Sequence, residues 1–599
     1  MTRSSPDTDE RRTRSAISAR LEGRVLVVTL ETPGEVNVLS RAAARQLSSV
    51  LCEVDEASVD ALVLRSGKRR SYLNGVGLML AGAVRTPEDV ARLSAEVRTA
   101  YRMLEELTVP TIAAIRGNCY GCGVELAIRC DHRIAADDFD THFYMPEVVD
   151  YLFVPCFGAT AELPRLVGLP RATELLLWGK RWSGADAVRS RLVDACVPAD
   201  DFDAQTMAFA LDVVADRRPP ATRSGPALVD PKWVERTWRR IDAMPREQRE
   251  VYRECFELMH RAATGRGDEA SARGRELLAA GRTVASTASK AAQGFFFARE
   301  TARVVSVGEE PEGARYRLVP AARSDLLAEI ASRRSADVLV GLPGPVAGES
   351  ELAIVVGSFE EPDGAAVAAS ARPFGRELGW PADVVAHAPM LAVGGDVVEV
   401  ACRPHAFATA RNLCAALARA GMKPVLTSPS RRLLTDDLAD AYATPLVAWL
   451  RAGGSKEALV ATLHSHGRVR PLADVLALLP PAHPGHALAG ATLPPASSGP
   501  GPEEATEASG ELMDALDLSL GAAAIRAIEG GVARHPAIVD LVAREALDYP
   551  LTRGSLCRWL DAQRLGEILS RADRLSHLVK PVDRERVHGW LGRGRSFYG

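Results

Sequence analysis

The sequence predicts an α/β protein whose C-terminal part is helical. Two observations support this class. In the first 130 residues, short β-branched apolar runs alternate with segments of helical periodicity, which indicates an α/β core. Similar short apolar runs return beyond residue 330, before helical patterns take over. A chain of 599 residues is too long for one hydrophobic core, so three or four domains are expected.

The N-terminal elements follow one another in a regular order. The run VLVVTLETP after Arg24 and the run ALVLRSG at residues 61–67 are predicted strands because they are rich in Val and Leu. Between them, Arg41 to Asp55 carries apolar residues at helical spacing. The segment TVPTIAAIRGN, residues 108–118, is a third buried strand that ends at a glycine before a helix.

The remaining chain changes pattern several times. A Pro/Arg-rich region near residues 217–231 ends the first α/β pattern, and residues 232–301 read as a long helical tract. The apolar runs ADVLVGLP, LAIVVGS and DVVAHAP then indicate a second α/β region. Residues 403–479 are predicted to be helical, the stretch ATLPPASSGPGPEEATEASG to be a linker, and residues 511–599 to be helical.

Composition excludes several classes of function. The chain is 47% hydrophobic and 25% charged with a net charge of −4, so it has no basic excess for nucleic acid. Its N-terminus, MTRSSPDTDERRTRSAISARLEG, is polar and is predicted to be a disordered leader rather than a signal peptide. No run of 18 apolar residues appears, and the ten cysteines are scattered. These features predict a cytoplasmic protein without a membrane span.

The stretch NCYGCGVELAIRC, residues 118–130, invites a metal or redox interpretation. Cys119 and Cys122 form a C-x2-C pair and Cys130 follows. A structural zinc needs four ligands, and no second pair lies at a suitable distance. A redox C-x-x-C would open the helix after the first strand of its fold, whereas this one follows the third. The sequence therefore predicts no metal site.

The same stretch fits a strand, a glycine turn and a helix that starts near Gly121. Backbone N–H groups at a helix N-terminus attract negative charge, as an oxyanion hole requires. The Gly-rich segment SYLNGVGLML, residues 71–80, is a candidate for the second donor because it also follows a strand.

Four motifs together resemble the crotonase (enoyl-CoA hydratase/isomerase) superfamily over residues 20–215. They are SYLNGVGL, GNCYGCGVELAIRCDHRIAADD, MPEVVDYLFVPCFGATAELPRLVG and GKRWSGADAVRSRLVDACVP. The resemblance implies that an acyl-CoA thioester carbonyl binds the backbone N–H groups of Val76 and Cys122. It also implies two catalytic glutamates, Glu125 in GVELA and Glu147 in MPEVV. Cys122 stands where the family usually has glycine, but its N–H is retained.

Two carboxyls suit the hydration of a 2-enoyl-CoA. Water must lose a proton as it attacks C3, and C2 must receive one, so one acid can act on water while the other exchanges a proton with carbon. A single glutamate would more readily suit double-bond isomerisation. Hydration requires no cofactor, because the substrate itself carries the CoA. The acyl chain, and the choice between hydratase and isomerase, stay open.

The second half resembles multifunctional fatty-acid β-oxidation proteins through QGFFFARET, VVEVACRPHAFATARNLCAALARAGMKPVLT and GWLGRGRSFYG. In that family a 3-hydroxyacyl-CoA dehydrogenase follows the crotonase domain. The resemblance implies this order: leader 1–19, crotonase-like domain 20–215, helical linker region 216–301, shortened Rossmann-like domain 302–395, helical dehydrogenase-type domain 396–480, flexible linker 481–510 and second helical domain 511–599.

The dinucleotide motif of the dehydrogenase family is altered in this chain. The motif VxVxGxGxxG reads VVSVGEEPEG here, so Gly308 and Gly313 keep the outer spacing while Glu310 replaces the middle glycine. Carboxylates at this turn would repel a pyrophosphate, and NAD binding is not expected. His387 and Glu399 match the family's catalytic His–Glu pair, and we interpret them as a vestige of that site.

The sequence thus predicts an enoyl-CoA hydratase, or a 3-hydroxyacyl-CoA dehydratase in the reverse direction, fused to a degenerate dehydrogenase half. One alternative is a bifunctional hydratase/dehydrogenase that uses NAD, and another is a non-catalytic acyl-CoA-binding scaffold. The expected ligand is an acyl-CoA. The resemblance leaves open a homo-oligomer or a thiolase-type partner.

Overall fold

The computed structural model describes most of the chain in two compact units. The described residues are 16–217, 229–265, 269–307, 316–321, 338–343, 354–356, 367–370, 384–387, 397–402, 404–419, 422–428, 433–468, 507–570 and 574–598. Unit 1 comprises Met1–Asp242 and Gln248–Gln293, and unit 2 comprises Ala243–Glu247 and Gly294–Gly599. No described helix combines the length and apolar character needed to cross a bilayer.

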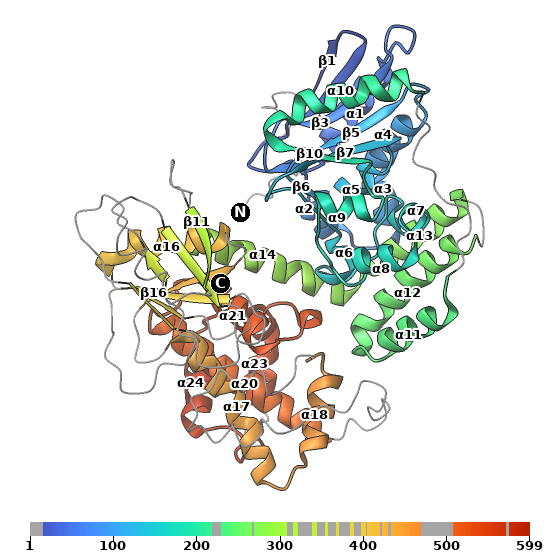
Figure 1. Cartoon of the computed structure of the whole chain (residues 1–599). Helices are drawn as coiled ribbons and strands as arrows, with labels where there is room; N and C mark the ends of the chain where they lie inside the picture. The colour runs from blue at the N-terminus through green and yellow to red at the C-terminus, as the bar shows by residue number, and fades with distance from the viewer. Residues whose placement is uncertain are drawn as a thin grey trace, which may run out of the picture. The chain divides into compact units, whose positions relative to one another are not determined.

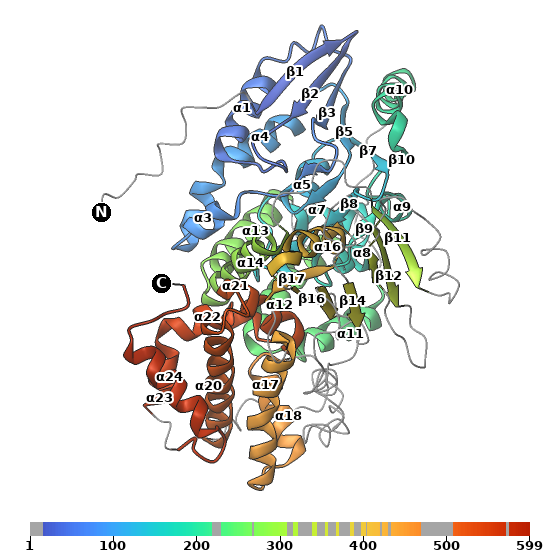
Figure 2. The same cartoon turned by 90° about the vertical axis from the view of Figure 1, so that its left-hand side faces the viewer.

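A six-stranded sheet with the order β1-β2-β3-β5-β7-β10 forms the centre of unit 1 (Figures 1 and 2). Its strands are β1 (Ile17–Glu22), β2 (Val25–Leu30), β3 (Ala61–Ser66), β5 (Thr111–Ile115), β7 (His132–Asp137) and β10 (Ala195–Pro198). β1 pairs antiparallel with β2, and the other neighbours pair in parallel. The three strands predicted from the sequence are confirmed as β2, β3 and β5. The predicted leader boundary at residue 19 is wrong, because β1 begins at Ile17 and is held by β2.

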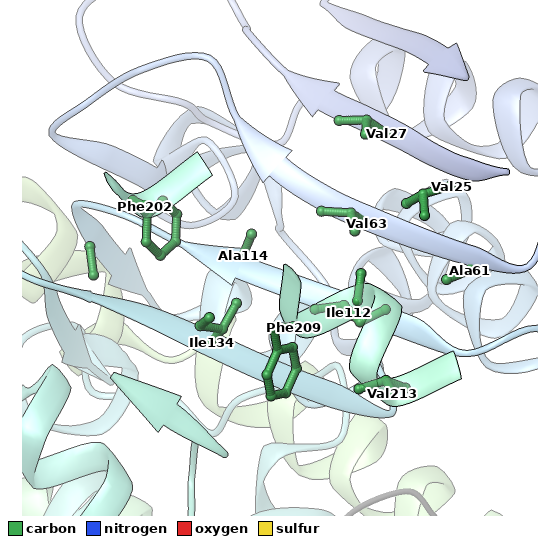
Figure 3. Close-up of a cluster of buried hydrophobic side chains, with 12 residues drawn as sticks. Val25, Val27, Ala61, Val63, Ile112, Ala114, Ile134, Phe202, Phe209 and Val213 are labelled. Atoms are coloured by element: carbon green, nitrogen blue, oxygen red, sulfur yellow. The ribbon is translucent and has the colours of Figure 1, made fainter. Parts of the chain in front are cut away.

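One face of this sheet packs against α10 (Phe202–Ala215), as Figure 3 shows. Alternate residues of the strands, such as Val25, Val63 and Ile112, point to this face because side chains alternate along a strand. Phe202 and Phe209 of α10 complete the cluster. The helix predicted near residues 41–55 is confirmed as α1 (Arg41–Cys52), which packs against α4 (Ala95–Glu105).

A second sheet of unit 1 has the order β4-β6-β8-β9. Its strands are β4 (Ser71–Leu73), β6 (Asn118–Tyr120), β8 (His142–Tyr144) and β9 (Trp182–Ser183), of which β4, β6 and β8 are parallel. These three lead into α2 (Leu78–Ala83), α5 (Cys122–Ala127) and α6 (Pro146–Val149). The carboxyl ends of parallel strands lie at one edge, so this edge gathers the residues that follow each strand.

Helices complete unit 1. They include α3 (Pro87–Leu93), α7 (Ala159–Leu166), α8 (Leu169–Leu176) and α9 (Gly184–Arg189). The predicted helical tract of residues 232–301 is confirmed as α11 (Pro231–Asp242), α12 (Arg246–Ala263), α13 (Glu269–Val284) and α14 (Thr287–Val307). From Gly294 on, α14 belongs to unit 2.

Unit 2 contains two small sheets of mixed strand direction. The first has the order β11 (Tyr316–Ala321), β12 (Val338–Pro343), β13 (Ile354–Val356), and the second has the order β14 (Val367–Ser370), β15 (Val384–His387), β16 (Val397–Cys402), β17 (Lys423–Thr427). The β12–β13 and β15–β16 pairs are antiparallel. The prediction that residues 396–480 are helical is wrong at β16 and β17. Both are short apolar runs, and every residue of β16 is buried, so burial in the sheet prevails over the helical pattern around them.

The C-terminal part of unit 2 is helical, as predicted. Its helices are α16 (Phe407–Arg419), α17 (Leu434–Arg451), α18 (Lys456–Ser465), α20 (Glu507–Glu529), α21 (Pro536–Leu547), α22 (Leu556–Trp559), α23 (Leu565–Leu569) and α24 (Pro581–Gly592). α20 begins four residues before the predicted start at residue 511. The rest of the predicted linker, residues 481–506, and the altered motif Gly308–Gly313 lie outside the described residues.

Candidate active site

Two glycine turns meet at the carboxyl edge of the second sheet. A Cβ on Gly123 would lie 2.2 Å from the carbonyl oxygen of Leu73, and a Cβ on Gly75 would lie 3.8 Å from that of Tyr120. The turn after β4 and the turn after β6 are therefore in direct contact. The first contains Val76 and the second ends at Cys122, so the structure brings the two predicted N–H donors to the same edge.

The backbone at this edge leaves N–H groups available. Cys122 is the first residue of α5, so its N–H has no carbonyl one turn earlier to bond. Its carbonyl is held instead by the hydroxyl of Tyr101, which donates a hydrogen bond of 2.7 Å. In the turn after β4, the N–H of Leu39 donates to the carbonyl of Gly75 at 3.0 Å. This hydrogen bond does not involve the N–H of Val76.

Glu125 lies in α5 and is buried, with 1% of its surface exposed. Its Oε1 accepts hydrogen bonds from the backbone N–H groups of Phe157 at 2.9 Å and Ala159 at 3.2 Å. These donors fix the carboxyl at the start of α7. Burial raises the pKa of Glu125 well above its usual range, and the nearby carboxyls of Glu276 and Glu147 raise it further.

Glu147 lies in α6 and is 8% exposed. Its Oε1 touches the backbone of Gly121, since a Cβ on that glycine would lie only 2.3 Å away. Its Oε2 has no hydrogen-bond partner among the described residues. Burial, the largest cause, raises the pKa of Glu147 to about 8. The two predicted glutamates thus flank the N-terminal turn of α5, one in its first turn and the other against its cap.

A third buried carboxyl, Glu276 of α13, belongs to the same cluster. It is 1% exposed and accepts hydrogen bonds from the N–H groups of Gly158 and Thr160. Burial raises its pKa to about 7. Glu276 is not among the site residues predicted from the sequence. Its signal was an acid on the apolar stripe of a helix, because the buried residues of α13 recur at helical spacing: Ala272, Glu276, Ala279, Ala280 and Thr283.

A buried ion-pair cluster fixes the loop between α6 and α7. The Arg129 guanidinium donates to the carbonyl of Phe157 and pairs with Glu105 at 2.5 Å and with Glu162. Arg273 of α13 also pairs with Glu105 at 2.7 Å and Glu162 at 3.0 Å. This cluster anchors the segment whose N–H groups hold Glu125.

The raised pKa values predict an unusual dependence of stability on pH. An unfolded glutamate titrates near pH 4.5, so between that pH and about 8 the folded protein holds a proton on Glu147 that the unfolded chain has lost. Stability from this group is therefore lost as pH rises, by up to about 1.4 kcal/mol per pH unit. We expect Glu147→Gln to raise the melting temperature relative to wild type, and to do so more at pH 8 than at pH 5. Exposed Glu235 offers the control, since Glu235→Gln should change the melting temperature equally at both pH values.

The three cysteines of residues 118–130 are buried thiols. Burial raises the pKa of Cys119 and Cys122 and raises that of Cys130 to about 12, so the thiolate that binds metals is disfavoured. Within the described ranges, no group of three His, Cys, Asp or Glu side chains is arranged to hold a metal ion.

His387 and Glu399 lie opposite each other in the antiparallel register of β15 and β16. The carboxylate of Glu399 is buried and accepts the N–H groups of Leu434 and Thr435 at 2.7 and 2.8 Å, at the start of α17. Glu399 therefore stabilises a helix N-terminus. The interpretation of the pair as a vestige stays a prediction.

Comparison with known proteins gives a family match and several similar relatives. Residues 20–221 match the family model described as enoyl-CoA hydratase/isomerase. The fatty acid oxidation complex subunit alpha of Shewanella baltica (strain OS185) is 36% identical over 181 residues, 30% of this chain and 26% of the relative. That of Shewanella amazonensis is 35% identical over 206 residues, 34% of this chain and 29% of the relative. The chain therefore spans about a quarter of the length of the curated relatives it matches.

Solved structures also match part of the chain. An enoyl-CoA hydratase from Bacillus anthracis is 26% identical, with coverage of 40% of this chain and 90% of that chain and a TM-score of 0.32. One from Mycobacterium avium subsp. paratuberculosis K-10 is 20% identical, with coverage of 47% and 96% and a TM-score of 0.35.

Proposed function

We propose that unit 1, in which residues 20–221 match the enoyl-CoA hydratase/isomerase family model, hydrates a 2-enoyl-CoA thioester, or dehydrates a 3-hydroxyacyl-CoA in reverse. One observation carries the proposal. Two buried carboxyls, Glu125 and Glu147, flank a helix N-terminus whose first N–H has no intrahelical acceptor.

The N–H groups of Val76 and Cys122 would bind the thioester oxygen. Addition of water at C3 moves electrons onto this oxygen and creates an enolate, whose charge the two N–H groups and the N-terminus of α5 stabilise. One such donor is typically worth about 2.7–4 kcal/mol in the transition state. Both donors belong to the backbone, so the Cys122 side chain can replace glycine without loss of this function.

The two carboxyls would move the protons. Burial raises the pKa of both groups, and the nearby carboxyls raise it further: Glu276 and Glu147 for Glu125, and Asp150 and Glu276 for Glu147. At neutral pH the pair therefore retains a proton, and one member can donate while the other accepts. One carboxyl removes a proton from water as it attacks C3, and the other delivers a proton to C2. The presence of two carboxyls favours hydration over isomerisation, which needs fewer groups, and it disfavours a non-catalytic scaffold.

The described residues of unit 2 do not fit an NAD site at the altered motif. A dinucleotide motif follows a strand and opens a helix, whereas the residues before Gly308 are the last turn of α14. The neighbouring sheets also mix strand directions. We therefore propose that the second half does not oxidise 3-hydroxyacyl-CoA. The name of the Shewanella relatives supports a place in fatty-acid oxidation. An oligomer, a thiolase-type partner and a cytoplasmic location stay predictions.

A panel of 2-enoyl-CoA thioesters of increasing chain length, with and without NAD, tests the proposal on the whole chain. We expect loss of the absorbance of the conjugated thioester for at least one chain length, and no NADH when NAD is added. Formation of NADH that is lost in His387→Gln would show a working dehydrogenase and the bifunctional alternative. Tight binding of the thioesters without turnover would favour the scaffold.

A further inference from the structure

We propose that Glu276 of α13 is a positioning residue of this site, which holds the N-terminus of α7 against Glu125 and acts with its charge on the Glu125–Glu147 pair. The inference rests on the proposed hydration. It extends the site beyond the residues that match the family, which end at residue 221, to a helix about 50 residues further along the chain.

Successive N–H groups at the start of α7 bind two different carboxyls. Those of Phe157 and Ala159 donate to Glu125, and those of Gly158 and Thr160 donate to Glu276. The hydroxyl of Thr160 also donates to Glu276. Any movement of Glu276 therefore moves the amides that orient Glu125.

α13 is packed firmly enough to fix Glu276. A Cβ on Gly281 would lie 2.5 Å from the carbonyl oxygen of Pro87, so α13 and α3 are in backbone contact. Ala280 and Val284 share a buried cluster with Val84 and Val90. The hydroxyl of Thr283 accepts the N–H of Val154 at 3.0 Å, in the loop between α6 and α7.

The titratable groups around Glu276 come from every neighbouring element. They are Glu125 of α5, Glu147 of α6, Cys156 of the following loop, Glu162 of α7 and Cys255 of α12. The nearby cations, Arg129 and Arg273, form ion pairs with Glu105 and Glu162. In the described part of the chain Glu276 forms no ion pair. Its charge is therefore not neutralised by an ion pair of its own.

The sign of the effect follows from the charges. A negative Glu276 disfavours the charged forms of Glu125 and Glu147 and raises the pKa of each. Removal of the Glu276 charge therefore lowers the pKa values of both glutamates. Because Glu276 carries its charge only above about pH 7, the basic limb of a bell-shaped pH–rate profile should then move to lower pH.

The test compares the pH profile of kcat/KM for whole-chain wild type, Glu276→Gln and Glu276→Asp. We expect Glu276→Gln to move the basic limb to lower pH by about one unit, and the optimum to lower pH with it, with a smaller change in KM than in kcat. Glu276→Asp keeps the charge but shortens the side chain, so it should lower kcat and leave the optimum in place. The matched control is Glu254→Gln on α12, where Glu254 pairs with Arg282 of α13. This variant should change neither kcat nor the pH optimum.

An unmoved optimum in Glu276→Gln, with activity retained or uniformly lowered, would overturn the proposal and leave Glu276 a structural residue. Wild type without hydratase activity on any thioester would instead overturn the proposed function, and this inference with it.

Discussion

Glu125→Gln and Glu147→Gln are each expected to lower kcat by about 10²–10⁴-fold, the usual contribution of a general acid or base. Gln keeps the shape of the side chain and can still accept the N–H groups of Phe157 and Ala159 at position 125, but it cannot exchange a proton. The loss should therefore fall on turnover and not on binding. Steady-state hydration kinetics measure kcat and KM, and calorimetry with a saturated acyl-CoA measures binding directly.

The exposed Glu235→Gln in α11 is the control for a simple loss of one negative charge and should retain wild-type kcat. The double variant should lose little more than the worse single variant, because the two carboxyls act as a unit. Near-wild-type turnover in either single variant would contradict the assignment of that glutamate.

Gly121→Ala is expected to lower kcat by at least about 100-fold. Gly121 has φ +53° and ψ −120°, a conformation that side chains disfavour by about 1–3 kcal/mol. Its added Cβ would also meet Oε1 of Glu147 at 2.3 Å. Either the carboxyl or the turn must move, and the turn carries the N–H of Cys122. A displacement of about 1 Å in a catalytic group can cost 10²-fold in rate.

Gly168→Ala is the matched control. Gly168 has φ +83° and caps α8, but a Cβ there meets nothing within 4 Å. It should therefore lower the melting temperature through backbone strain while kcat stays within a few fold of wild type. If both alanine variants lost activity equally, general destabilisation and not contact with Glu147 would explain the effect.

The site elements that the sequence predicts are those with local signals. Glycines beside short strands mark the two turns, and Glu125 and Glu147 lie within five residues of a strand end. The structure brings these segments together through the parallel pairing of β4, β6 and β8. The catalytic roles of the two glutamates stay proposals.

Other features depend on contacts between distant segments. Glu276 reads as one acid among many in an Arg/Glu-rich helix, and only the docking of α13 buries it. Arg129 likewise gains its role from Glu105 and Glu162. In unit 2, β16 and β17 are not predicted because helical patterns lie beside them in the sequence. Such short strands depend on their sheet for stability, and the local sequence does not show the sheet.

The position of Glu276 along the chain has a consequence for synthesis. A ribosome adds about 5–20 residues per second, so the 55 residues from 222 to 276 emerge about 3–11 s after the family-matched segment is complete. During this interval Gly158 and Thr160 lack their acceptor, and Val84 and Val90 lack the apolar partners on α13. Until α13 has been synthesised, the nascent domain therefore exposes these apolar side chains and the N–H groups of Gly158 and Thr160.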